Sequence, residues 1–558
     1  MAKKRVLIIG GVAGGASCAA RLRRLDESAE IILLERGPYV SFANCGLPYY
    51  VGDVIRDEAK LLVSTPQLFR ERFNVDVRTL NEAASIDRQA SEVVVRDHST
   101  GLEYRERYDA LVLSPGAAPI RPPLPGIHSP GIFTLRTVPD SRQVREWIES
   151  RNPRRAVVIG GGFIGLEMAE NLVHRGLEVT LVEMARQVMP PLDSEMAEYV
   201  RRRLVPHLAR LQLGDGVAGF EQAPDGSLTV RTQSGKEFVT DIVILAIGVR
   251  PETSLARNAG LEIGDRGGIR VDDQMRTSDP QIWAVGDAVE VRNVITGQWE
   301  SIPLAGPANR QGRIAAEVIS GRGSHFRGVQ GTAVCGFFGL TVALTGATER
   351  SLRRSGIKDF EAVHLHPGHH VGYYPGAKPI HLKLIFRKTD GLILGAQAVG
   401  EEGAERRIDV ISMAIQMGAT VFDLEEAELC YAPQYGAARD PVNMAGMVAA
   451  NVVHGDVSQA QWKDVHAGDV FCLDVREPAE FRAGSVDGAV NIPLGQLRDR
   501  LEELPRDREI WVKCSVGQRA YYACRLLRQH GFDVKNLPGG YHTYRAWHPE
   551  EPSENRKS

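Results

Sequence analysis

Seven cysteines are scattered along the chain, and their spacing limits the chemistry that they can support. No Cys-x-x-Cys pair occurs, so we expect neither a metal site nor a dithiol centre, and each thiol is judged singly. Cys45 differs from the others because it lies ten residues after Glu35, at the start of a segment with a helical pattern. A thiol at a helix N-terminus has its thiolate favoured by the backbone dipole, which suits a nucleophile.

Two glycine turns form the second chemical feature. Each follows a β-branched run and precedes a helical pattern, and each helical pattern leads to an apolar run that closes on an acid, Glu35 or Glu183. Glycines let the backbone approach a pyrophosphate at a helix N-terminus, and the acid accepts a hydrogen bond from a ribose hydroxyl. The repeat predicts two dinucleotide sites. Their expected residues are Gly10, Gly11, Gly14, Gly15, Glu35 and Arg36 in the first, and Gly160, Gly162, Gly165 and Glu183 in the second.

The elements that position these groups belong to a multidomain α/β protein. The chain has 558 residues, a formal net charge of −3, 43% hydrophobic and 25% charged residues. This balance gives no reason to expect nucleic acid or a membrane surface as a partner, and no apolar run reaches the ~18 residues that a bilayer span needs. We expect a soluble, cytoplasmic protein of about three to five domains.

Three more segments resemble the two secondary signatures of two-dinucleotide flavoprotein reductases. They are Leu111–Ala117, paired with Ile244–Pro251, and Thr277–Asp287. The resemblance implies that Asp287 binds the ribityl chain of FAD. It also implies a glutathione-reductase-like pair of Rossmann-like domains followed by an α+β dimerisation domain. The expected boundaries are 1–113 with 248–318 for FAD, 114–247 for NAD(H), and 319–446 for dimerisation.

The segment Ser41–Tyr50 closely resembles the single-cysteine branch of the pyridine nucleotide-disulfide reductases, with Cys45 as the redox thiol. This branch contains coenzyme A disulfide reductases, NADH-dependent persulfide reductases, and NADH oxidases and peroxidases. The oxidases and peroxidases place a histidine in the first glycine turn, where this chain has Ala13, which argues against peroxide. The coenzyme A reductases carry two tyrosines, matched here by Tyr373 and Tyr431, which the resemblance places near Cys45 of the partner subunit in a homodimer.

The same resemblance implies a site for coenzyme A. Arg21 and Arg24 are three residues apart on a helical pattern and share a face suited to phosphate groups. The nicotinamide cofactor is expected to be NADH, because the Glu183 carboxylate repels a 2′-phosphate, although nearby Arg186 leaves NADPH open. The implied substrate-binding residues are Ser17, Arg21, Arg24, Ser41, Asn44, Asn309 and Arg439.

After a polar linker over 447–461, the tail at 462–550 resembles a rhodanese-like α/β domain. The resemblance is carried by Leu473–Phe481, by Gly488–Leu494 and by Val512–Arg519. It implies that Cys514 and Arg519 bracket a loop whose amides form an anion-binding nest able to hold a persulfide. Phosphatases of this fold need one more residue in the loop, so four intervening residues favour sulfur transfer.

Together these features predict an FAD- and NAD(P)H-dependent enzyme that reduces coenzyme A persulfide and related persulfides or polysulfides at Cys45 and transfers sulfur at Cys514. One alternative is a coenzyme A disulfide reductase with accessory thiosulfate sulfurtransferase activity. Another is an NADH oxidase that forms peroxide or water. In a different class, the tail is a docking or redox-sensing module that recruits a sulfur-carrier protein.

Overall fold

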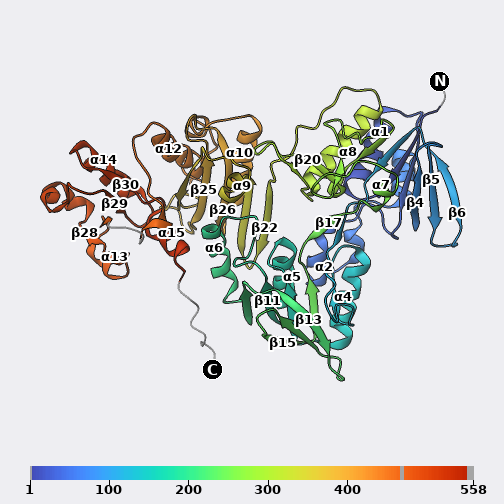
Figure 1. Ribbon diagram of the computed structural model, residues 1–558, viewed down its shortest axis with the longest axis horizontal. Coiled ribbons are helices and arrows are strands. Elements are labelled where there is room, and N and C mark those ends of the chain that lie inside the picture. The colour runs from blue at the N-terminus through green and yellow to red at the C-terminus, as the bar shows by residue number, and fades with distance from the viewer. Residues whose placement is uncertain (1–2, 466–469, 550–558) are drawn as a thin grey trace. The chain divides into compact units, whose positions relative to one another are not determined.

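A computed structural model describes residues 3–465 and 470–549 (Figure 1). The chain folds as two compact units. The first contains the residues up to Arg186 together with Leu208–Gly331, and the second contains Gln187–His207 together with the chain from Thr332 onward. The chain therefore passes between the units three times. The mixed α/β class predicted from the sequence is confirmed.

Five parallel strands form the sheet that carries the first glycine turn. Its central strands are almost wholly apolar, as expected where helices cover both faces of a parallel sheet. Helices α1 (Ala13–Leu25) and α8 (Ala305–Ile319) cross closely, because a Cβ on Gly312 would lie 2.1 Å from the Gly14 carbonyl oxygen. The strand order is β19 (Ile282–Ala284), β7 (Ala110–Leu113), β1 (Arg5–Ile9), β2 (Glu30–Glu35) and β3 (Asp76–Thr79).

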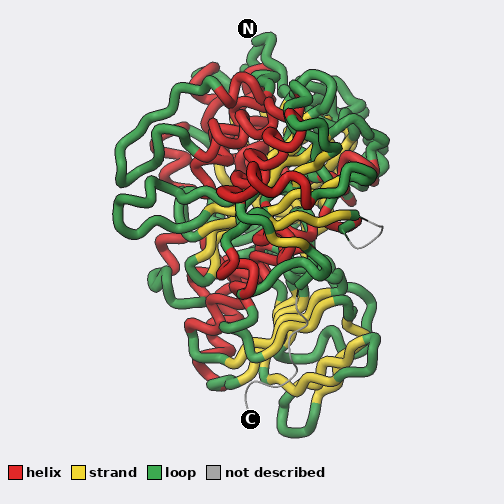
Figure 2. The backbone as a smooth tube through the Cα atoms, turned by 90° about the vertical axis from the view of Figure 1, so that its left-hand side faces the viewer, coloured by secondary structure: helices red, strands yellow, loops and turns green. Residues whose placement is uncertain are grey.

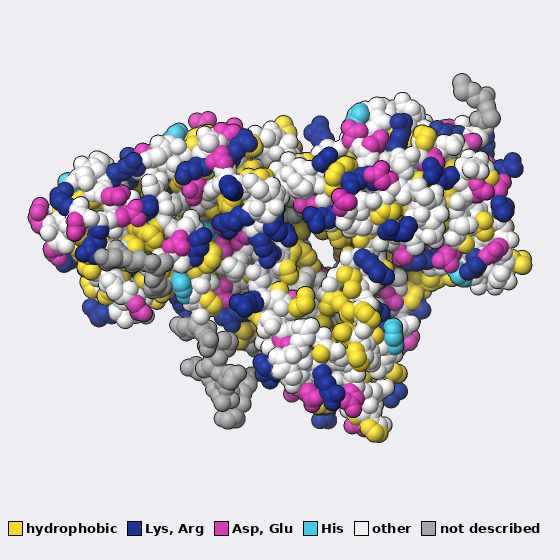
Figure 3. Space-filling model, viewed as in Figure 1, with side chains coloured by type: hydrophobic (Ala, Val, Ile, Leu, Met, Phe, Trp, Pro, Cys, Tyr) yellow, Lys and Arg dark blue, Asp and Glu magenta, His cyan; other side chains and the backbone are white. Residues whose placement is uncertain are grey.

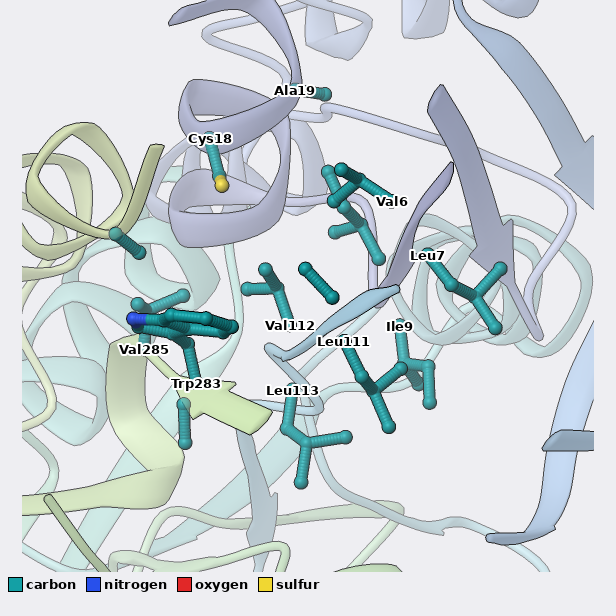
Figure 4. Packing of buried hydrophobic residues seen from close by; sticks show 14 of the residues in the cluster. Val6, Leu7, Ile9, Cys18, Ala19, Leu111, Val112, Leu113, Trp283 and Val285 are labelled. Carbon is teal, nitrogen blue, oxygen red and sulfur yellow. The ribbon is translucent and has the colours of Figure 1, made fainter. Parts of the chain in front are cut away.

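The core of this sheet is closely packed against α1. Cys18 points from α1 toward the strands, and Val112 and Trp283 lie below it (Figure 4). Cys18 is fully buried, and burial raises the pKa of its thiol to about 12. This thiol therefore contributes to core packing, as buried free cysteines commonly do.

A second five-stranded parallel sheet repeats the same plan around the second glycine turn. Its helices are α4 (Val138–Arg151) and α5 (Phe163–His174). Figure 2 shows the backbone with its helices in red and its strands in yellow. The strand order is β12 (Arg210–Leu213), β11 (Glu178–Glu183), β10 (Arg155–Ile159), β16 (Ile242–Leu245) and β9 (Ile132–Phe133).

Smaller sheets and short helices complete the first unit. The sheets consist of β4 (Asn81–Asp87), β5 (Glu92–Asp97) and β6 (Glu103–Arg107); of β13 (Val217–Gln222), β14 (Leu228–Thr232) and β15 (Glu237–Thr240); of β8 (Ala117–Pro119) and β17 (Val249–Pro251); and of β18 (Ile269–Arg270), β20 (Val289–Arg292) and β21 (Trp299–Glu300). The short helices are α2 (Leu47–Val51), α3 (Pro66–Phe73) and α7 (Ser254–Asn258).

The second unit is built on a five-stranded antiparallel sheet. Its order is β22 (Ala333–Phe337), β23 (Leu340–Gly346), β26 (Ile393–Gly400), β25 (Ile380–Phe386) and β24 (Glu361–Leu365). Its helices are α9 (Glu349–Arg354), α10 (Ala404–Gln416), α11 (Val421–Glu425) and α12 (Pro441–Val453). Because α12 continues to Val453, the expected linker over 447–461 starts inside a helix.

A buried cation fixes helix α6 (Ser194–Leu204) to this sheet. The Nζ of Lys383, on β25, lies 2.9 Å from an Asp193 oxygen and 2.7 Å from a Glu349 oxygen, and it also contacts Glu195. Lys383 is fully buried, and the three carboxylates raise the pKa of its amine against the effect of burial. The segment Gln187–His207 is therefore an integral part of the second unit.

The tail folds around a four-stranded parallel sheet within the second unit. Its core contains Leu473, Ile492, Val512 and Leu527, all fully buried. The strand order is β28 (Val490–Asn491), β27 (Phe471–Asp474), β29 (Ile510–Lys513) and β30 (Val534–Asn536), with helices α13 (Pro478–Arg482), α14 (Gln518–Gln529) and α15 (Gly540–Trp547).

Histidines line the contact between the tail and the rest of the second unit. The Nδ1 atoms of His366 and His381 are 2.8 Å apart, and His366 Nε2 lies 2.9 Å from the Thr543 hydroxyl on α15. The ring of Tyr199, on α6, stacks on His381 with 3.7 Å between ring centres. Burial lowers the pKa of His381 to about 3 and also lowers that of His366, so both imidazoles are neutral near pH 7.

The surface agrees with the near-neutral charge balance. Basic and acidic side chains are interspersed over most of the face shown in Figure 3. Within residues 3–465 and 470–549, no helix has the length and apolar character needed to cross a bilayer.

Candidate active sites

The first glycine turn brings the start of α1 close to β1 and β2. Gly10 has a φ of +93°, and a Cβ on Gly15 would lie 1.9 Å from the Gly10 carbonyl oxygen, so both positions require glycine. The first turn of α1 contains no acidic residue and receives no side-chain cap. The Glu35 carboxylate accepts hydrogen bonds from the Gly11 and Gly37 amides at 2.9 and 2.8 Å.

The second turn repeats this arrangement. Gly160 has a φ of +108°, and a Cβ on Gly165 would lie 1.9 Å from the Gly160 carbonyl oxygen. Glu183 accepts hydrogen bonds from the Gly161 and Ala185 amides at 2.6 and 2.7 Å. A Cβ on Gly162 would meet no atom within 4 Å, which leaves open space at the start of α5.

Both turns fit a dinucleotide. Each presents a helix N-terminus without an acidic residue or a side-chain cap, so its amides and dipole can receive a pyrophosphate. Each also presents a carboxylate at the end of the neighbouring strand, where a ribose hydroxyl would lie. The residues present therefore fit FAD at the first turn and a nicotinamide dinucleotide at the second.

Cys45 lies in the same unit as these turns, on a short 3₁₀ turn (Asn44–Gly46) that leads into α2. Cys45 is exposed as a residue, although neighbouring groups surround its sulfur. Partial burial raises its pKa, as do the charges of Glu167 and Asp287, whereas the charge of Arg136 lowers it. The direction of this shift is opposite to the one expected from the helix dipole, because burial and then the two carboxylates raise the pKa, and α2 has only five residues.

Arg136 connects the residues around Cys45. Its guanidinium lies 3.7 Å from the Asp287 carboxylate, on the 3₁₀ turn after β19, and it also hydrogen-bonds to the Asn44 amide oxygen when that amide is oriented to satisfy both partners. Burial raises the pKa of Asp287, and Arg136 opposes that shift. Arg136 was not among the residues predicted from the sequence, because nothing in the local pattern distinguishes it from other surface arginines.

The expected substrate-binding residues are divided between the two units. Arg21 is held by Glu317, with 2.6 Å between the charged atoms, so its charge is already paired. Arg24 is exposed, and its guanidinium lies 5.9 Å from the centre of the Phe73 ring. The Ser17 hydroxyl donates to Asn309 in a very short hydrogen bond. Ser41 has a φ of +50° and lies in the loop before Cys45.

The remaining expected residues lie elsewhere. Arg36 pairs with Glu252 at 3.2 Å in the first unit. Arg439 is exposed in the second unit, directly before the Asp440 cap of α12.

Tyr373 and Tyr431 come from different loops of the second unit and meet at their hydroxyl groups. The two phenol oxygens are 2.6 Å apart. Both side chains are exposed, at 74% and 45%. The hydrogen bond to Tyr373 raises the pKa of Tyr431, so this phenol stays protonated near neutral pH. The two tyrosines are 58 positions apart, so their contact arises from the fold and not from local sequence.

Cys514 lies at the end of β29 with its sulfur enclosed by the following loop. The Gly517 amide donates to Cys514 Sγ at 3.1 Å, and Gly517, with a φ of +96°, is the N-cap of α14. The Arg519 guanidinium also interacts with the Cys514 thiol. The loop therefore offers the sulfur a backbone donor and a cation, the groups that stabilise a sulfur anion.

Glu480 on α13 holds Arg519 in place. It accepts two hydrogen bonds from the guanidinium, each at 2.7 Å, and a third from the Ser515 hydroxyl at 2.7 Å. The hydrogen bonds from Arg519 lower the pKa of Glu480 to about 2. This positioning role was missed by the sequence analysis, although Glu480 lies within the Leu473–Phe481 segment.

Comparison with known families divides the chain into three matches. A family described as pyridine nucleotide-disulphide oxidoreductase matches residues 4–312, and its dimerisation domain matches residues 332–440. A rhodanese-like domain matches residues 458–546.

Several individual proteins are also similar. The coenzyme A disulfide reductase of Staphylococcus epidermidis is 36% identical over 450 residues, which are 80% of this chain and 99% of that protein. The crystal structure of reduced Bacillus anthracis CoADR-RHD is 49% identical with a TM-score of 0.96, covering 98% of this chain and 99% of that one. A NAD-dependent persulfide reductase from A. fulgidus is 39% identical with a TM-score of 0.89, covering 97% and 99%.

Proposed function

Because this chain belongs to the pyridine nucleotide-disulphide oxidoreductase family and ends in a rhodanese-like domain, we propose that it reduces low-molecular-weight persulfides to sulfide. The substrate class is coenzyme A persulfide and related persulfides or polysulfides. The reaction consumes NADH, a proton and RSSH and yields NAD⁺, RSH and H₂S. The observation that carries the proposal is the enclosed Cys514 sulfur, with its Gly517 amide and Arg519 cation, in the same chain as the exposed thiol of Cys45.

The nucleotide sites set the electron path. Bound FAD supplies a two-electron relay between the nicotinamide and sulfur. Gly10, Gly14 and Gly15 allow its pyrophosphate to approach α1, and Asp287 is assigned to its ribityl chain. Glu183 is held by two amides beside the second turn, where it accepts from a 2′-hydroxyl and repels a 2′-phosphate, so we propose NADH as the preferred donor.

Cys45 is the proposed nucleophile. Its thiolate attacks the persulfide, forming either a Cys45 mixed disulfide with release of hydrosulfide or a Cys45 persulfide with release of the thiol. Because burial and the charges of Glu167 and Asp287 raise the pKa of Cys45, Arg136 has the role of favouring the thiolate.

Tyr373 and Tyr431 are the proposed proton donors to the leaving sulfur. Their phenol groups share one short hydrogen bond at an exposed position, which suits a pair that reaches into the Cys45 site of a partner subunit. The family's dimerisation domain matches the region that carries Tyr373 and Tyr431, which supports this arrangement.

The domain boundaries expected from the sequence are proposed with one change. The FAD-binding domain comprises 1–113 and 248–318, the NAD(H)-binding domain 114–247, and the rhodanese domain 462–550. The dimerisation domain begins at 319 and is extended to Val453, where α12 ends, so that the linker follows that helix.

Coenzyme A disulfide reduction is the second candidate. The Staphylococcus epidermidis relative, which matches four-fifths of the chain, has that name. In this case the tail is an accessory thiosulfate sulfurtransferase, and the reductase converts one disulfide, NADH and a proton into two thiols and NAD⁺.

Anaerobic NADH consumption distinguishes the candidates. Purified protein loaded with FAD is given coenzyme A persulfide or coenzyme A disulfide, and sulfide release is measured in parallel. Faster turnover on the persulfide with stoichiometric sulfide, abolished in Cys45→Ser, is the expected result. A preference for the disulfide would refute the proposal and support the second candidate. A Cys514→Ser variant, expected to lose thiosulfate sulfurtransferase activity alone, tests the role of the tail.

A further inference from the structure

Two loops of the second unit bring Tyr373 and Tyr431 together, and neither tyrosine is anchored by burial. Tyr373 lies between β24 and β25, and Tyr431 lies between α11 and α12. Side chains that are 74% and 45% exposed do not fix their own geometry. A hydrogen bond of 2.6 Å between two such phenols therefore requires that the loops themselves are held in register.

A buried ion pair lies beneath both loops. Arg407 on α10 is 1% exposed, and Asp440, which caps α12, is 2% exposed. The Arg407 guanidinium donates to both Asp440 oxygens, at 3.2 and 2.8 Å. The same guanidinium donates to the His369 carbonyl at 2.7 Å, so one side chain hydrogen-bonds to both the Tyr373 loop and the end of the Tyr431 loop.

Further hydrogen bonds join the two loops to each other and to this ion pair. The Val371 amide donates to the Gly436 carbonyl at 3.0 Å, which joins the two loops directly. Arg406 donates to Asp440 at 3.0 Å and to the Tyr435 carbonyl at 3.2 Å. A Cβ on Gly436 would lie 3.5 Å from an Asp440 oxygen, so this loop packs against the pair.

We propose that the buried Arg407–Asp440 pair is a positioning device that sets the geometry of the Tyr373–Tyr431 proton donor. This inference rests on the proposed function, in which the tyrosines protonate the leaving sulfur. Neither Arg407 nor Asp440 is expected to touch the substrate. A buried pair of this kind contributes more to a defined arrangement than to net stability, because the desolvation of both charges offsets much of their attraction.

The test is a double-mutant cycle between Asp440→Asn and Tyr431→Phe. Asparagine caps a helix as well as aspartate does, so α12 retains its cap while the charge of the pair is lost. Asp390→Asn, which breaks an exposed Arg387–Asp390 pair in the same domain, is the matched control. The readouts are kcat for coenzyme A persulfide and the rate of anaerobic flavin reduction by NADH, which does not use the tyrosines.

We expect Asp440→Asn to lower kcat about tenfold or more, since small misplacements of a catalytic group are costly. The same change in the Tyr431→Phe background should have less than about a twofold effect, because coupled residues are not additive. Flavin reduction and the Asp390→Asn variant should keep wild-type rates.

Three results would overturn the inference in distinguishable ways. If Tyr431→Phe is slow but Asp440→Asn has no effect, or an equal effect in both backgrounds, only the positioning role fails. If Tyr431→Phe turns over as fast as the wild type, the role of the tyrosines in the proposed function fails and the positioning role fails with it. If Asp440→Asn does not fold, Arg407→Lys enters the same cycle, because lysine keeps the charge but cannot bind Asp440 and His369 together.

Discussion

The histidine contact of the tail makes its attachment sensitive to acid. His381 lies within hydrogen-bonding distance of His366 and stacks on Tyr199, while Arg202 on α6 and His542 on α15 face the same imidazole. Burial and these neighbours lower the pKa of His381 to about 3 from an ordinary value of 6.5. Once the contact opens, the imidazole returns to its ordinary pKa, so the open state binds the proton more tightly.

The pH dependence of this contact follows from the difference between the pKa of His381 in the closed state and its pKa in the open state. Above pH 6.5 both states are neutral and the contact is fully stable, whereas stability is lost as the pH falls below 6.5 toward 3. One pKa unit corresponds to about 1.4 kcal/mol, so acidification to pH 5 costs about 2 kcal/mol for a fully buried imidazole. His381 is only partly buried, which reduces the cost to about 1 kcal/mol, or about a fivefold change in the opening equilibrium.

Hydrogen exchange followed by mass spectrometry can measure this opening. The Tyr541 and His542 amides, which donate to the Cys514 and Ser515 carbonyls at 2.8 and 3.1 Å, lie in the segment to be followed. After correction for intrinsic exchange, the protection of this segment should fall about fivefold more in the wild type than in His381→Asn between pH 7.5 and pH 5. His530→Asn, which removes an exposed histidine of the tail, should behave as the wild type. Equal pH dependence in the wild type and His381→Asn would show that His381 does not make this contact sensitive to acid.

Three other perturbations test the packing and the sites. Lys383→Met leaves the buried Asp193 and Glu195 carboxylates without their cation, so we expect a loss of about 3 to 5 kcal/mol in thermal or urea unfolding, and an unchanged unfolding midpoint would contradict this account. Gly165→Ala places a Cβ 1.9 Å from a carbonyl oxygen, so it should lower both the melting temperature and the rate of NADH-dependent flavin reduction. Gly162→Ala, whose Cβ would have no atom within 4 Å, should keep the wild-type melting temperature. Similar melting temperatures for the two variants would show that the turn can relax. Glu480→Gln removes the carboxylate that holds Arg519, so it should lower the kcat of thiosulfate sulfurtransferase about tenfold. Persulfide reduction at Cys45 should not change. An unchanged sulfurtransferase kcat would show that Glu480 does not position Arg519 for the reaction.

The sequence was most informative where local backbone geometry dictates residue type. Gly10, Gly15, Gly160 and Gly165 are required by positive φ or by contact with a carbonyl oxygen, so the two dinucleotide turns could be placed before the fold was known. Family resemblance then supplied the order of domains, and the matches over residues 4–312, 332–440 and 458–546 confirm the family.

The sequence was least informative where partners come from distant parts of the chain. Arg136 meets Asp287 across 151 positions, and no periodicity in either segment signals that contact. The pKa direction at Cys45 was also missed, because it depends on burial of the thiol and on Glu167 and Asp287 rather than on the helix that follows the thiol. Arg407 and Asp440 read as ordinary charged residues until the fold buries them together.

Because the chain passes between its two units three times, proteolytic cleavage and gene fusion act differently on different parts of it. A single break after Gly331 would leave Gln187–His207 on the first fragment, separated from Lys383 and the sheet on which α6 packs. The reductase portion therefore cannot be divided into two self-sufficient pieces by one cleavage, and complementation by such fragments would require an exchanged segment. The rhodanese-like tail is different, because the chain enters it once, after α12, so a gene fusion can add or remove it without rearranging what precedes it.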